Sequence, residues 1–245
     1  MATTSPVLRD RTGVLDAAAS ALGGLFAGLS RVRHDKPIHT PGSVYAARFH
    51  RAGVAGPWST PWLTEGGEEE GIGRLSRAVG LPWPLPDVLG LALRFPGPEG
   101  RPCDLLLSTT GLAPVARHLM LPRVAAGRAV YSTLFPYRDR RGAVLLAALP
   151  DRITNAAGDQ LRFVLAAATP GSRWRPFGTV ELTRPAGDPP VTFDPVRHPL
   201  PGLFLPDPVA RLRAVSYAAA RQARGSGLDA GFGSGVDAGS DGGTP

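Results

Sequence analysis

Five short apolar runs, separated by residues rich in glycine and proline, most strongly constrain the fold of this 245-residue chain. Each run has the length of a typical strand and is too short for most globular helices. Spacing of this kind predicts a mainly antiparallel sheet or barrel, and RRG at 140–142 predicts a turn before the third run. The runs are LGLALRF at 89–95, DLLLSTT at 104–110, AVLLAAL at 143–149, LRFVLAAA at 161–168 and GTVELT at 178–183.

The two ends of the chain differ from its middle. A helix is predicted to begin near residue 208, because Asp207 can cap it and Pro208 suits its first turn. Residues 225–245 are rich in glycine, serine and aspartate, contain no basic residue, and predict a disordered tail. Residues 1–30 are expected to form a polar lead and an amphipathic helix, since apolar side chains recur at helical spacing over 13–29: Leu15, Leu22, Leu25, Phe26 and Leu29. The predicted fold class is therefore α+β, a mainly antiparallel β-barrel over 31–224 with flanking helices.

Composition excludes several classes of function. The formal net charge is +7, but Lys36 is the only lysine and the arginines are scattered along the chain, so we expect no nucleic-acid partner. Cys103 is the only cysteine, which excludes an internal disulfide and a cysteine-built metal site. No apolar run approaches the roughly 20 residues that span a bilayer, and the expected location is the cytoplasm.

Other candidate sites are weaker. The acidic run EGGEEEG at 65–71 is interpreted as a solvated, glycine-rich loop. Four histidines show no metal-ligand spacing, namely His34, His50, His118 and His198.

RLRAVSYAAARQAR at 211–224 places a phenol between guanidinium groups on one helical face. Arg213 precedes Tyr217 by one turn, and Arg224 follows seven residues after it. Nearby arginines and a ferric iron both stabilise a phenolate, which otherwise forms only near pH 10. The alanines at 218–220 would let a flat macrocycle approach, as a haem held by tyrosinate requires. The alternative is a packing tyrosine with incidental arginines.

Four segments, in order, resemble haem catalases. FDPVRHPLPGLFLPDPVARLRAVSYAAARQAR at 193–224 is similar to the segment that carries the proximal tyrosine of that family. KPIHTPGSVYAARF at 36–49 resembles its distal segment, RLSRAVGLPWPLPDVLGLALRF at 74–95 resembles its R-F-S stretch and the strand that follows, and DLLLSTT resembles its D-L-V-G-N-N. The resemblance covers about half of the chain and implies a small, catalase-like haem-binding domain over 31–224.

The resemblance also implies roles for individual residues. Tyr217 would bind the iron of haem b, with Arg213 moderating the electron density that the tyrosinate supplies. His39 would accept a proton from peroxide and return it to the departing oxygen, and Ser76 would hold the His39 ring. Three cations, Lys36, Arg74 and Arg224, would pair with the haem propionates.

The chain also departs from the family pattern. Ser108 stands at the position of the distal asparagine, and its hydroxyl is shorter than a carboxamide. Lys36 replaces an arginine, which turns a bidentate contact into a point charge. The resemblance still implies an enzyme that consumes hydrogen peroxide or organic hydroperoxides as a monomer or small homo-oligomer. Two alternatives stay open: a non-catalytic haem binder, and a haem-free catalase-like barrel that binds a protein partner or a membrane surface.

Overall fold

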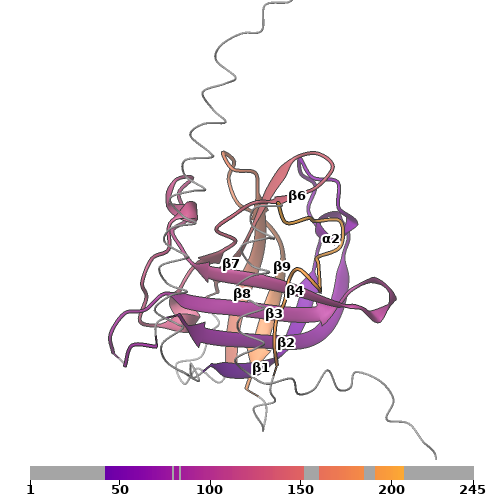
Figure 1. Ribbon diagram of the computed structural model, residues 1–245. Helices are drawn as coiled ribbons and strands as arrows, with labels where there is room; N and C mark the ends of the chain where they lie inside the picture. Colours follow the sequence, from indigo (N-terminus) through magenta and orange to yellow (C-terminus); the bar gives the residue numbers. More distant parts are fainter. Residues whose placement is uncertain (1–41, 79, 83, 152–159, 185–190, 207–245) are drawn as a thin grey trace, which may run out of the picture.

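Nine antiparallel strands form the described part of the protein, and eight of them close into a barrel (Figure 1). The computed structural model describes residues 42–78, 80–82, 84–151, 160–184 and 191–206. The strand order is β5-β4-β3-β2-β1-β9-β8-β7, and pairing of β5 with β7 closes the ring, while β6 pairs with β7 alone. Closure removes the exposed edges that an open sheet would present to other chains.

The strands are β1 (Ser43–Arg51), β2 (Gly67–Arg77), β3 (Leu89–Pro96), β4 (Pro102–Thr109), β5 (Tyr131–Ser132), β6 (Tyr137–Arg138), β7 (Ala143–Pro150), β8 (Gln160–Ala168) and β9 (Arg175–Thr183). The short helices are α2 (Pro61–Thr64), η1 (Pro98–Gly100), η2 (Ala116–His118) and η3 (Ala126–Arg128).

The five apolar runs are confirmed as strands β3, β4, β7, β8 and β9, and the barrel is confirmed with them. The turn predicted at 140–142 is also confirmed, since the Asp139 N–H donates to the Gly142 carbonyl and Gly142 has a φ of 141°. The flanking helices are supported only loosely. Within the described ranges the one α-helix is the four-residue α2, and the helices predicted at 13–29 and from 208 lie outside those ranges.

The interpretation of 65–71 as a loop was wrong, because Gly67–Gly71 begins β2. The carboxylates of Glu68 and Glu70 point to solvent, where they pair with His50 and Arg48 of β1. A glycine within β2 serves close packing rather than a turn: a Cβ on Gly73 would lie 2.6 Å from a Leu182 methyl group.

The inner face of the barrel holds the large apolar side chains. Trp62 of α2 closes one end of this core by stacking on Phe95, with ring centroids 5.3 Å apart. Successive side chains along a strand point to opposite faces, so every second residue of each strand points outward. We call the outward-facing residues of β1 to β4 the outer face.

No helix in the described part of the chain combines the length and hydropathy of a bilayer-crossing segment.

Cys103 should be chemically inert in the folded protein. Burial and the neighbouring Asp104 carboxylate raise the pKa of the Cys103 thiol to about 11. About one thiol in a thousand is then ionised at pH 8, and the thiolate is the reactive form. We expect a thiol reagent at pH 8 to label the native chain at least about 100-fold more slowly than the chain unfolded in urea. Equal labelling rates in the two states would contradict the buried position.

Candidate functional site

Ser76, Gly90 and Ser108 lie in one register row across three strands of the outer face. Ser76 of β2 pairs with Gly90 of β3, and Gly90 pairs with Ser108 of β4. All three are half-buried. Neighbouring strands lie about 4.8 Å apart, so the two serine Cα atoms are about 10 Å from one another across the glycine. The row therefore presents two hydroxyls on either side of a position that has no side chain.

Gly90 keeps the middle of this row flat. A Cβ on Gly90 would lie only 2.8 Å from the Ser76 Oγ, so any larger residue would crowd that hydroxyl. The next row along the strands consists of Val44, Arg74, Ala92 and Leu106, in which Arg74 is the one charged residue. A planar ligand could approach such a surface closely, whereas a large side chain in its centre would prevent contact.

Arg74 lies at the margin of the outer face, beside the start of β1. A Cβ on Gly42 would lie 2.6 Å from the Arg74 Nε, so the guanidinium runs along the Gly42 backbone. His39, which precedes Gly42 by three residues in the sequence, lies outside the described residues.

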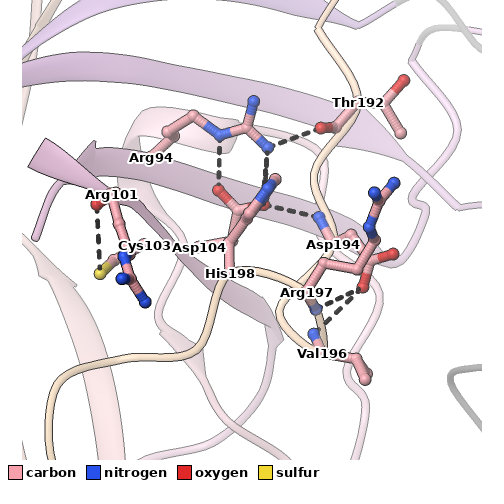
Figure 2. A network of polar contacts seen from close by, with 9 residues as sticks. All are labelled: Arg94, Arg101, Cys103, Asp104, Thr192, Asp194, Val196, Arg197 and His198. Atoms are coloured by element: carbon pink, nitrogen blue, oxygen red, sulfur yellow. Dashed lines mark hydrogen bonds and ion pairs between the residues drawn. The ribbon is translucent and has the colours of Figure 1, made fainter. Parts of the chain in front are cut away.

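A buried ion pair fixes residues 191–206 to the outer face (Figure 2). The Asp104 side chain has no solvent exposure, and two nitrogens of Arg94 donate to its two oxygens at 2.7 Å. The Asp194 backbone N–H donates to the Asp104 Oδ2 at 2.6 Å, and Arg94 also donates to the Thr192 carbonyl at 2.7 Å. The segment that leads toward Tyr217 therefore crosses β3 and β4 on the face that carries the serine row.

His198 completes this network. Its Nδ1 lies 3.0 Å from both the Asp104 Oδ2 and the Arg94 Nη2, and its carbonyl accepts from the Asp104 N–H at 2.9 Å. The Asp194 Oδ1 accepts hydrogen bonds from the backbone N–H groups of Val196 and Arg197. A compact turn results, and Figure 2 shows it folded against the strands.

The network gives structural roles to two residues that the sequence patterns did not single out. The Arg94 side chain is only 19% exposed, and the Phe193 ring lies 5.2 Å from its guanidinium carbon. His198 has no metal-ligand spacing, yet it contacts a buried carboxylate. One signal could have revealed the pair: Arg94 and Asp104 are single charges within apolar runs that a short turn joins, so an antiparallel hairpin places them opposite each other.

The structure brings together only part of the predicted site. Arg74, Ser76 and Ser108 lie on the outer face. The two serines share one register row, and Arg74 lies in the adjacent row. The remaining site residues lie outside the described ranges, namely Lys36, His39, Arg213, Tyr217 and Arg224. Among the described residues, no group of three or more histidine, cysteine, aspartate or glutamate side chains could hold a metal ion. On the outer face, Gly90 and Ala92 leave the centre without large side chains, as a flat macrocycle would require.

Comparison with known proteins supports the fold. Solved structures similar to this chain include a fungal catalase and catalase A from Saccharomyces cerevisiae, each with a TM-score of 0.53 and 14% sequence identity. The match covers 82% of this chain, and the chain spans 62% and 64% of the lengths of these two proteins. At this identity the likeness shows a shared catalase-like fold. Neither protein-family models nor curated protein sequences give a match.

The Asp104 carboxylate should be important for stability. Asp104→Asn removes the counter-charge of Arg94 inside the protein, and breaking a buried pair in this way costs about 3 kcal/mol or more in free energy of unfolding. Glu70→Gln is the matched control, since Arg48 and Glu70 form a pair whose side chains are 71% and 79% exposed. The control should change the free energy of unfolding by less than about 1 kcal/mol. Denaturant unfolding that gives the same small change for both variants would contradict the buried network.

Proposed function

We propose that this chain binds haem b against the outer face and consumes hydrogen peroxide or organic hydroperoxides. The observation that carries the proposal is the row of Ser76, Gly90 and Ser108 on the outer face of a catalase-like barrel. A flat position between two hydroxyls suits a planar group, with polar atoms available above it. The proposal also includes residues outside the described ranges, which belong to the segments that resemble those of catalases.

Each residue of the proposed site has one task. Tyr217 holds the iron as a phenolate, and Arg213 stabilises that charge. The propionates pair with Lys36, Arg74 and Arg224. When bound, the haem supplies the electrons for cleavage of the peroxide O–O bond.

The distal residues move one proton. His39 would accept it from one peroxide oxygen and return it to the oxygen that leaves. Ser76 hydrogen-bonds the His39 ring and so fixes the ring orientation and tautomer. Ser108 offers a hydroxyl to the peroxide, although this hydroxyl reaches less far than the carboxamide that the catalase pattern has there. The proposed enzyme should therefore align peroxide less well than a catalase does, and alignment affects rate steeply.

Ser108 also favours a second function, a haem-binding protein without peroxide turnover. In that case the outer face and Tyr217 keep the cofactor, while the distal side has lost an essential polar group. The two functions predict the same spectrum and different kinetics.

Haem binding is tested by a titration followed in the visible spectrum. The full chain should develop a stoichiometric Soret band with the pattern of a ferric tyrosinate. Tyr217→Phe should lose or shift that band, because phenylalanine offers the iron no ligand. Tyr45→Phe is the matched control, since Tyr45 is a buried core residue on the inner face, and its spectrum should equal that of the wild type. A wild-type chain that binds no haem, or identical spectra for wild type and Tyr217→Phe, would refute the proposal.

Peroxide turnover separates the two functions. In the enzyme, His39→Ala should lower kcat/KM by about 10²–10⁴-fold because the proton carrier is lost. Ser108→Asn should raise kcat/KM by as much as about 100-fold, since a carboxamide restores peroxide alignment. His50→Ala is the control, because His50 is exposed on β1 and pairs with Glu68. If neither His39→Ala nor Ser108→Asn changes the rate, the distal residues take no part in turnover, and the haem-binding protein without specific catalysis is favoured.

A further inference from the structure

Exposed apolar side chains gather on two loops of the barrel. Six of the eight exposed large hydrophobic residues in the described part of the chain lie in the β2–β3 loop (78–88) or in the loop that joins β4 to β5 (110–130). Folded proteins seldom expose such a concentration unless it meets another surface. The six residues, 39–76% exposed, are Leu81, Leu85, Leu112, Val115, Leu119 and Val124.

The two loops lie side by side and are held in place. The backbone of Asp87 exchanges two hydrogen bonds with that of Arg123, at 3.0 and 2.8 Å. The buried Asp87 carboxylate accepts from the N–H groups of Gly80 and Leu81 at 2.8 and 3.1 Å. Figure 1 shows both loops on the side of the barrel where β2 and β4 end and β3 begins. The backbone that carries the exposed side chains is therefore already held by hydrogen bonds, so binding would not pay the entropic cost of ordering these loops.

A buried arginine fixes the second loop further along its length. Arg117 donates to the Thr169 and Ser172 carbonyls of the β8–β9 turn at 3.3 and 3.0 Å. Its guanidinium carbon lies 4.5 Å from the centre of the Trp174 ring. The tryptophan in turn donates to the Leu112 carbonyl at 3.1 Å, so Leu112 stands on a rigid backbone.

The charges of these loops have one sign. Arg123 and Arg128 are exposed, and the described residues of both loops include no exposed acidic residue, because Asp87 is buried beside Arg77. The opposite end of β2 carries Glu68, Glu69 and Glu70, each within reach of a basic partner on β1. The described residues of the two loops thus combine exposed apolar and cationic side chains, whereas the carboxylates of β2 are paired with cations of β1.

We propose that the two loops form a docking surface for an anionic lipid bilayer. We define this loop surface as the six exposed apolar residues together with Arg123 and Arg128. A bilayer offers a plane of negative headgroups above hydrocarbon, which complements the exposed cations and apolar side chains of the loop surface. The inference does not depend on haem binding.

Vesicle co-sedimentation of the full chain tests the proposal. The protein should bind vesicles of phosphatidylcholine with phosphatidylglycerol much more tightly than vesicles of phosphatidylcholine alone. The double variant Leu81→Ser with Leu85→Ser should weaken binding about tenfold or more, because two apolar anchors are lost. Arg123→Glu with Arg128→Glu should weaken it by at least as much. These residues are exposed, so the thermal midpoint should stay near that of the wild type.

Matched controls come from the rest of the surface. Val196→Ser with Phe204→Ser removes the two exposed large apolar residues of the described part of the chain that lie outside the loops, and Arg48→Glu with Arg101→Glu reverses two exposed charges outside the loop surface. Both controls should change the partition by less than about twofold.

Four outcomes would overturn the proposal. One is equal binding to neutral and anionic vesicles, or no binding to either. A second is undiminished binding by the loop variants. A third is loss of binding only when Leu22, Leu25 and Phe26 are replaced by serine, which would make the N-terminal segment the anchor. A fourth is that the loop variants change the oligomeric state in sedimentation and leave vesicle binding intact, which would make the loop surface a contact between copies of the chain.

Discussion

The buried carboxylate of Asp104 determines where the last described segment of the chain lies. A charge without solvent exposure is costly unless donors surround it, and here Arg94, the Asp194 N–H and the His198 ring meet its two oxygens. Two of these partners belong to residues 191–206, so the segment must remain on β3 and β4 for the carboxylate to stay paired. The position of the chain that leads toward Tyr217 is therefore set by electrostatics within the barrel wall, on the same face as the serine row.

The inner and outer faces of the strands have different roles in the molecule. Large side chains fill the interior, whereas Ser76, Gly90, Ala92 and Ser108 form a patch of small residues on the outer face that a planar group could approach. Ser76 and Ser108 each lie one residue before the end of their strands, β2 and β4, and the loop surface follows directly. The proposed haem face and the proposed membrane surface therefore share one end of the barrel, although they depend on different residues and can fail independently.

Sequence patterns predicted the strands whose apolar runs are continuous and missed those whose runs are not. β2 was missed because glycines and exposed glutamates interrupt it, and β1 was missed because Arg48 and His50 break its apolar run. Only the pairing of Glu68 and Glu70 with β1, and the tight packing at Gly73, explains why such residues suit a strand. Ser76 and Ser108 are 32 positions apart, and their common row depends on a register that local patterns cannot supply. Residues with an ordinary appearance in sequence, such as Arg94 and His198, gain importance only from a buried partner.

The central claim is that a flat outer face at Gly90 receives haem, and one haem titration tests it most directly. The parent variant is Ser76→Ala, and it is compared with the double variant that adds Gly90→Leu. Ser76→Ala is needed first because a Cβ at position 90 would lie 2.8 Å from the Ser76 hydroxyl oxygen. Thr179→Leu adds the same side chain to the outward side of β9, outside the proposed face. The account predicts that the leucine at 90 weakens haem binding at least tenfold with an unchanged thermal midpoint, while Thr179→Leu has no effect. Equal haem affinity for the leucine variant and its parent would contradict the account.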